Sequence, residues 1–248
     1  MISLVSRGYK KYKGIAMNVG FYAAKIQAQV MRHRENIEYA YERYPDTTKF
    51  WALIDLVGSS NYRLLKGPGK GYLRGETFFS LVGEVITPYS EIELLKEIGD
   101  ASLLSAASLR PLLESLVLAD QVAFEMRLLA GDEQFPFAIR AAISYGPVKK
   151  LTRPGKPQDY LGSPLDQLAR ILGIRSGDTN LFLHEAAYQA QEPIVAEYSN
   201  FLSISSVKSL SAQESKGMLQ PVYYRELKID RNELREFRGH FNPWRESK

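Results

Sequence analysis

The order of the apolar segments between residues 49 and 229 constrains the fold more than any other feature of the sequence. Short stretches rich in aliphatic and aromatic residues favour strands, and longer stretches with apolar residues at every third or fourth position favour helices. Strand-like segments are 49–56, 92–98, 101–109, 137–146, 180–184, 201–207 and 220–229, and helix-like segments are 15–44, 76–89, 109–131, 165–174 and 185–191. The pattern predicts an α+β fold: a helical extension over residues 1–48 and one domain over residues 49–248.

Turn residues divide these segments. Gly99 and Asp100 lie between two strand-like segments, which predicts a β-hairpin. Residues 61–75 contain five glycines or prolines, and we expect a loop there. We also expect a loop over residues 153–164.

Composition limits the functional classes. The chain has 248 residues and no cysteine, which excludes disulfides, thiolate metal sites and a cysteine nucleophile. No apolar run approaches ~20 residues, and the N-terminal apolar run is too short for a signal peptide. We therefore expect a cytoplasmic protein without a membrane partner. The net charge of +4 suits a nucleotide or nucleic acid, although such a small excess is common.

Asp55 ends the apolar run of "FWALIDLVGSS", and Asp100 lies in the predicted hairpin turn. If the strand over residues 49–56 pairs beside that hairpin, both carboxylates emerge at the same end of one sheet. Two adjacent carboxylates repel each other unless a cation lies between them, and Mg²⁺ prefers such oxygen ligands. The alternative is that each aspartate is only a turn residue.

The residues after Asp55 point to phosphate binding. Gly58, Ser59 and Ser60 form a small, polar turn that opens toward a helix. Backbone N–H groups in such a turn can bind a phosphate group.

Five segments in order resemble the motifs of the class III nucleotidyl cyclases. They are "FWALIDLVGSS", "LLKEIGDASLLSA", "FAIRAAISYGPV", "QDYLGSPLDQLARIL" and "ESKGMLQPVYYREL". The resemblance covers residues 49 to 226 and implies a ferredoxin-like catalytic domain, with flanking helices on an antiparallel sheet. Residues 1–48 lie outside it.

The resemblance also assigns roles to individual residues. Asp55, Asp100 and the Leu56 carbonyl match the ligands of two Mg²⁺ or Mn²⁺ ions. Lys96 and Asp159 match the pair that recognises the base, Arg170 matches the arginine that stabilises the transition state, and Lys216 matches a lysine that contacts the outer phosphates. Asp166 stands where the family usually has the ribose-contacting asparagine. On a helix Asp166 lies one turn from Arg170 and is able to pair with it.

The identity of the base is the most open question. The resemblance implies that the Lys96–Asp159 pair would serve adenine. In having no sensor domain and a basic loop with Tyr62 and Arg63, the sequence more closely resembles the pyrimidine cyclases of bacterial anti-phage signalling. Tyr62 or Arg63 would fill the space left by a smaller base, or they belong to an ordinary solvated loop. We expect UTP as the substrate, then CTP, with an adenylate cyclase as the alternative.

The resemblance implies a homodimer with composite sites and a separate effector that binds the cyclic product. Two other classes remain open. One is a non-catalytic nucleotide-binding module, which retention of Asp55, Asp100, Lys96 and Arg170 disfavours. The other is a nucleic-acid-binding protein that uses the basic residues Arg7, Lys10, Lys11 and Lys13. The histidines His33, His184 and His240 are too scattered for a metal site.

Overall fold

The structure is a computed structural model that describes residues 23–28, 31, 42, 44–130, 136–151, 158–174, 180–211, 213–218 and 220–237. The chain divides into two compact units, residues 1–45 and 46–248. In the first unit, residues 23–28 are helical. The rest of the helix predicted over residues 15–44 lies almost entirely outside the described residues.

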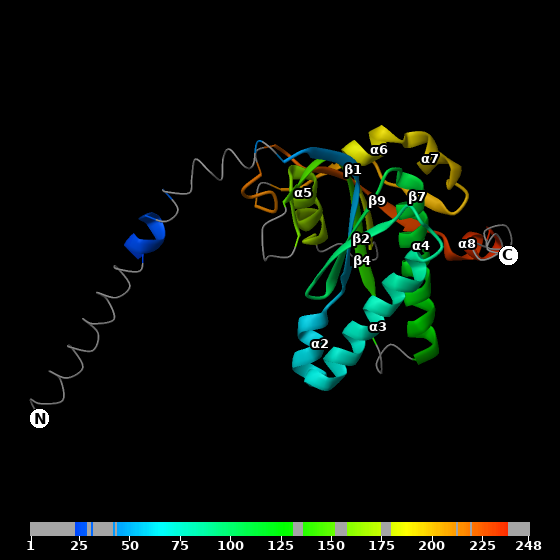
Figure 1. The fold of residues 1–248 in the computed structure, drawn as a ribbon. Coiled ribbons are helices and arrows are strands. Elements are labelled where there is room, and N and C mark those ends of the chain that lie inside the picture. Colours follow the sequence, from blue (N-terminus) through cyan, green and yellow to red (C-terminus); the bar gives the residue numbers. More distant parts are fainter. Residues whose placement is uncertain are drawn as a thin grey trace, which may run out of the picture. The chain divides into compact units, whose positions relative to one another are not determined.

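The second unit is built on one mixed sheet (Figure 1). Its main strands are β1 (Asp46–Leu56), β2 (Glu93–Ile98), β3 (Ala101–Ala106), β4 (Ile139–Leu151), β6 (Leu181–His184), β7 (Leu202–Ile204) and β9 (Tyr223–Ile229). The spatial order is β2-β3-β1-β4-β6-β9-β7, with β5 (Asp159–Leu161) paired to β4 and β8 (Lys208–Ser209) paired to β9. The predicted α+β fold is confirmed. Among the described pairs, β4 and β6 are parallel and the others are antiparallel.

Helices cover both faces of this sheet. On one face, α3 (Pro68–Ile86) and α4 (Leu109–Ala130) pack on the larger hydrophobic core. On the other face, α5 (Ser163–Leu172) packs on a smaller core. The alternation along β1 matches these two cores, because Phe50 and Ile54 face the first and Trp51 and Leu53 face the second. The same alternation places Asp55 on the α5 face.

The prediction of a loop over residues 61–75 is wrong. The segment contains α2 (Ser59–Lys66) and the start of α3, separated only by Gly67, whose φ is +90°. Pro68 is the first residue of α3, where a missing N–H group costs no hydrogen bond. Gly71 lies inside α3 because the helices approach closely there: a Cβ atom at this position would lie 2.9 Å from Cγ of Arg63.

Several smaller elements also differ from the predictions. The loop expected over residues 153–164 contains β5 and the start of α5, while residues 152–157 lie outside the described part. The elements β8, α7 (Glu192–Glu197) and α8 (Arg231–Phe237) were not predicted. The predicted hairpin and the long helix over residues 109–131 are confirmed as β2–β3 and α4.

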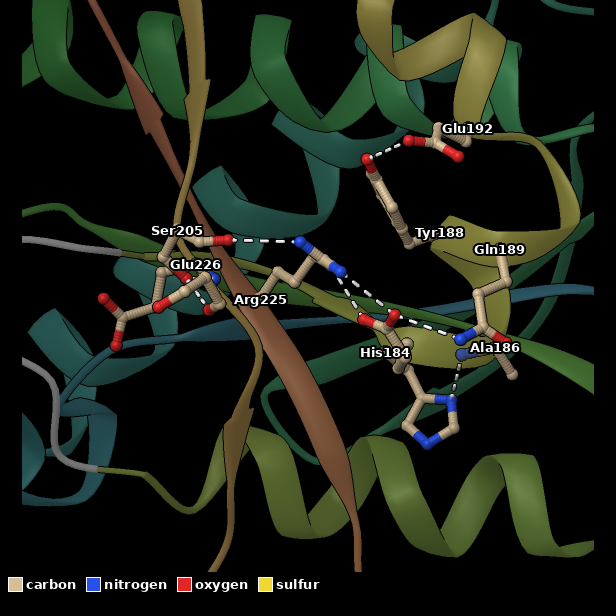
Figure 2. A network of polar contacts seen from close by, with 10 residues as sticks. His184, Ala186, Tyr188, Gln189, Glu192, Ser205, Arg225 and Glu226 are labelled. Carbon is tan, nitrogen blue, oxygen red and sulfur yellow. Dashed lines mark hydrogen bonds and ion pairs between the residues drawn. The ribbon is translucent and has the colours of Figure 1, made fainter.

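A polar network joins β6, α6 (Glu185–Ala190) and β9 (Figure 2). The Arg225 guanidinium binds Glu185 with Nε at 2.7 Å from Oε2 and Nη2 at 3.0 Å from Oε1. The Nδ1 atom of His184 accepts a hydrogen bond from the Ala186 N–H at 3.3 Å and caps α6. Burial lowers the pKa of His184 to about 4, so the ring is neutral at pH 7. His184 therefore has a structural role. His33 and His240 lie outside the described residues.

Candidate active site

Asp55 and Asp100 meet at one end of the sheet. In the antiparallel register Asp55 lies opposite Ala101, the residue after Asp100. Gly99 has a φ of +65°, which allows the hairpin to turn tightly. The N–H group of Leu56 donates to the Asp100 carbonyl at 3.0 Å, which ties the end of β1 to the turn.

The electrostatics of this pair fit a bound cation. Burial, followed by the charge of Asp100, raises the pKa of Asp55, while Arg140 lowers it. The Leu56 side chain is a buried hydrocarbon without a donor atom, so the group that Leu56 can offer a metal ion is its backbone carbonyl. Among the described residues, no group of three or more His, Cys, Asp or Glu side chains gathers as a metal cage. Two carboxylates with one carbonyl suit Mg²⁺, which completes its shell with water and substrate phosphates.

Arg140 also belongs to this site, although it was not among the residues predicted from the sequence. It lies on β4 directly opposite Asp55, with Nη2 at 3.5 Å from Oδ2. Its Nη1 donates to the Ile174 carbonyl at 2.9 Å, and its buried Nε has no hydrogen-bond partner. The available signal was an arginine in the apolar alternation of "FAIRAAISYG", because a charge in a half-buried strand needs a counter-charge.

The turn after β1 supports Asp100. Gly58 adopts a left-handed conformation, with φ of 70°, immediately before α2. The Ser59 hydroxyl donates to Oδ2 of Asp100. The N–H groups of the first turn, which includes Ser60, have no partner within the helix. These amides are the groups predicted from the sequence to bind phosphate.

Arg74 on α3 is a second residue near the site that was not predicted from the sequence. Its side chain is 3% exposed and binds two backbone carbonyls, Nη2 to Val57 at 2.6 Å and Nε to Pro136 at 3.0 Å. The guanidinium lies over the Tyr62 ring, 4.9 Å from its centre. Burial lowers the pKa of Arg74, and the charges of Tyr62 and Asp100 oppose this shift. Arg74 therefore holds the backbone of Val57, the residue that follows Leu56, in place.

Tyr62 and Arg63 do not lie on an exposed loop. Tyr62 is on α2, 7% exposed, and packs beneath Arg74. Arg63 is exposed and its side chain lies against Gly71 of α3. The Tyr62 ring is thus part of the α2–α3 packing.

Lys96 and Asp159 are 63 residues apart in sequence and form an ion pair. The distance between Nζ of Lys96 and Oδ1 of Asp159 is 3.2 Å, and the two side chains are 38% and 35% exposed. A β-bulge between Leu94 and Lys96 changes the register of β2 at this point. Both groups are therefore accessible to a ligand.

Arg170 and Lys216 form a separate group. Arg170 lies on the exposed face of α5, and a Cβ atom at Gly217 would lie 3.8 Å from its Nη2 atom. The turn that carries Lys216 is therefore beside Arg170. Asp166 is exposed one turn earlier, and the ion pair with Arg170 that the spacing would allow is not formed among the described residues. Within the described part of one chain, neither Arg170 nor Lys216 contacts Asp55 or Asp100.

The comparison with solved structures identifies the fold. Two of the similar structures are the guanylyl cyclase Cya2 (TM-score 0.58, 14% identity, covering 76% of this chain and 95% of that chain) and the adenylyl cyclase CyaB from P. aeruginosa (TM-score 0.59, 10% identity, 76% and 98%). A third is the guanylate cyclase domain of RhGC from Catenaria anguillulae in complex with GTP (TM-score 0.56, 11% identity, 73% and 96%).

No protein-family model matches the sequence, and no curated protein matches it. The structural likeness shows that the chain has the fold of a class III cyclase catalytic domain, a mixed sheet with flanking helices. None of the helices in the described part of the chain has the length and hydropathy needed to span a membrane.

Proposed function

We propose that the protein is a nucleotidyl cyclase that converts a nucleoside triphosphate into a 3′,5′-cyclic nucleotide and pyrophosphate. The observation that carries this proposal is the meeting of Asp55 and Asp100 at one end of the sheet of a cyclase fold. The accessible Lys96–Asp159 pair supports it, because a nucleotide also requires a site for its base.

Asp55, Asp100 and the Leu56 carbonyl would hold two Mg²⁺ or Mn²⁺ ions. When bound, such ions lower the pKa of the 3′-hydroxyl and neutralise the triphosphate. Arg140 orients the Asp55 carboxylate, and Ser59 orients that of Asp100. Both carboxylates are therefore positioned before the substrate arrives.

The remaining residues act on the substrate. The 3′-oxygen attacks the α-phosphorus in line, loses its proton to water, and the bond to pyrophosphate breaks. Arg170 neutralises charge that develops on the non-bridging oxygens, and losing such a group typically costs about 10²–10³ in rate. Lys216 contacts the outer phosphates, with the amides of Gly58, Ser59 and Ser60 beside them. Asp166 faces the ribose in the position usually held by asparagine.

We place these residues in a homodimer with two composite sites. Arg170 and Lys216 do not reach the carboxylates of their own chain in its described part. A second copy would bring Arg170, Lys216, Lys96 and Asp159 to the Asp55–Asp100 pair of the first. This arrangement would give each dimer two equivalent sites.

The proposed substrate is UTP, then CTP, with ATP as the alternative. The Lys96 ammonium can donate a hydrogen bond to a uracil carbonyl. The cytosine amino group is a donor and would instead need the Asp159 carboxylate as its acceptor. The packing of Tyr62 into α2–α3 removes the loop as an argument for a pyrimidine. The proposal rests on the Lys96–Asp159 pair, which would equally serve adenine. The cyclic product would act in the cytoplasm as a second messenger in anti-phage defence, read by a separate effector.

One experiment tests the reaction and the base together. The purified protein is incubated with each of the four triphosphates and Mn²⁺, and the cyclic products are resolved by mass. Cyclic UMP as the main product is expected. Mainly cyclic AMP would overturn the pyrimidine assignment, and no cyclic product would overturn the cyclase itself.

The control is the same incubation with Asp55→Ala or Asp100→Ala. Each variant should lose turnover, whereas a nucleic-acid-binding protein would keep its affinity for nucleic acid. The basic residues that favoured nucleic acid, Arg7, Lys10, Lys11 and Lys13, lie outside the described residues.

A further inference from the structure

A hollow of about 460 Å³ lies between α2, α3, the end of α4 and the residues that lead into β4. Its apolar lining includes Val57, Tyr62, Leu65 and Pro136. The size is that of a pocket for a small organic molecule. The hollow borders the candidate active site, because Gly58 of the turn after β1 lines it. It opens on the other side of the sheet, since α3 and α4 pack on the face opposite to the one that carries the Asp55 side chain.

The charged lining of this hollow has one sign. Its charged side chains are Lys66, Arg74 and Arg127, and no carboxylate lines it among the described residues. Lys66 is exposed at the end of α2, and Arg127 is half-buried near the end of α4. The positive charges of Lys66 and of the buried Arg74 beside one apolar hollow favour a negatively charged ligand.

Arg74 adds a second, independent observation. Its side chain is 3% exposed, and it binds two carbonyl oxygens and an aromatic ring. Its Nη1 atom is buried and has no hydrogen-bond partner. A buried guanidinium with an unused donor is costly unless an anion or another acceptor completes its hydrogen bonds.

We infer that this hollow binds a small organic anion, an oxyanion group carried on an apolar body. The oxyanion pairs with Lys66, Arg74 and Arg127, and the apolar body packs against Tyr62, Leu65 and Pro136. Phosphate and carboxylate share this chemistry, since both accept charge-assisted hydrogen bonds from guanidinium groups. Because Arg74 also holds the Val57 carbonyl, the ligand is one side chain away from the segment that carries Asp55 and Leu56.

The test is a calorimetric titration of the full chain in excess chelator, so that no divalent cation can support binding at the carboxylates. The probes are phenyl phosphate, benzoate, inorganic phosphate and phenol. Phenyl phosphate or benzoate should bind with one molecule per chain, and whichever binds more tightly identifies the oxyanion. Inorganic phosphate should bind more weakly, and phenol should not bind. No binding of either organic anion would overturn the inference.

The variants locate the binding site. Lys66→Glu and Arg127→Glu should each weaken the affinity by about tenfold or more, because each removes one charge-assisted contact and adds a repulsive charge. Lys70→Glu is the matched control: Lys70 is exposed on the first turn of α3 and does not line the hollow. The affinity of the Lys70→Glu variant for the organic anion should stay within about twofold of the wild-type affinity. Equal losses in Lys66→Glu and Lys70→Glu would show non-specific attraction and contradict the assignment.

Discussion

Ser59 donates a hydrogen bond to Oδ2 of Asp100, which joins the first residue of α2 to the turn of the β2–β3 hairpin. The two residues are 41 positions apart in the sequence. This contact orients one of the two carboxylates that we assign to metal binding, and it leads to the first prediction.

Ser59→Ala should weaken metal binding without unfolding the protein. A hydrogen bond to a charged group contributes about 1.5–3 kcal/mol, so the variant should need at least about tenfold more Mn²⁺ for half-maximal activity. Ser59→Thr keeps the hydroxyl and is the control. The measurement is cyclic product formed against Mn²⁺ concentration, and unchanged Mn²⁺ dependence in Ser59→Ala would contradict the orienting role.

Asp55→Asn should be inactive but more stable than wild type at pH 7 in the absence of metal. Burial and Asp100 raise the pKa of Asp55, so its charged form is disfavoured in the folded state. Such a group lowers the free energy of unfolding as the pH rises through its unfolded and then its folded pKa. Urea unfolding in chelator should show the gain at pH 7, and the gain should shrink toward pH 3.5. A less stable variant at pH 7 would show that the lost Arg140 contact dominates.

Mixing Asp55→Ala chains with Arg170→Ala chains should restore activity. Each variant alone is inactive, but a mixed dimer has one site in which both residues are intact. Random exchange makes about half of the dimers mixed, so the mixture should reach roughly a quarter of wild-type activity. Native mass spectrometry confirms that mixed dimers form. Inactive mixed dimers would place each complete site within one chain.

Arg74→Met should destabilise the domain. The substitution keeps much of the apolar stem but leaves the Val57 and Pro136 carbonyls without their donor. Each buried acceptor left unpaired costs about 1–3 kcal/mol, so the free energy of unfolding should fall by about 2–6 kcal/mol. The control is Lys70→Met on the exposed side of the same helix. Equal urea midpoints for the two variants would contradict this account.

His184 should make the protein lose stability between pH 6.5 and about pH 4. The pKa of His184 is lowered to about 4 by burial, so below pH 6.5 the unfolded chain binds a proton that the folded chain does not. The loss should reach about 3 kcal/mol at pH 4. His184→Asn keeps an acceptor for the Ala186 N–H (Figure 2) and should lack this component. If the free energy of unfolding of wild type and of His184→Asn varied identically with pH, His184 would not be the cause of the acid destabilisation.

Much of the scaffold was predictable from local patterns. The apolar run that ends in Asp55 and the Gly99-Asp100 turn each have a local signature, and pairing of neighbouring strands brings the two carboxylates together. The helices over residues 59–86 were missed because the glycines at 67, 69 and 71 suggested a loop. Only Gly67 interrupts the helices, and Gly71 is required by the close approach of Arg63.

The partners of Arg74 and Arg140 could not be assigned from local patterns. Each makes its decisive contacts with residues distant in sequence: Arg74 with Pro136, and Arg140 with Asp55. Periodicity reports which face of an element is buried, but it does not report which distant polar group a buried charge meets. Register and tertiary packing determine that choice.

Arg74 also has a mechanical consequence. Its planar guanidinium spans the carbonyls of Val57 and Pro136, and the N–H group of Val57 donates to the Ala138 carbonyl at 3.0 Å. Three hydrogen bonds thus join the exit of β1 to the entrance of β4, and two of them pass through one rigid group. The end of β1 and the start of β4 are therefore expected to move together as one rigid unit. A displacement of α3 would move this unit through Arg74, and Leu56 and Asp55 would shift with it.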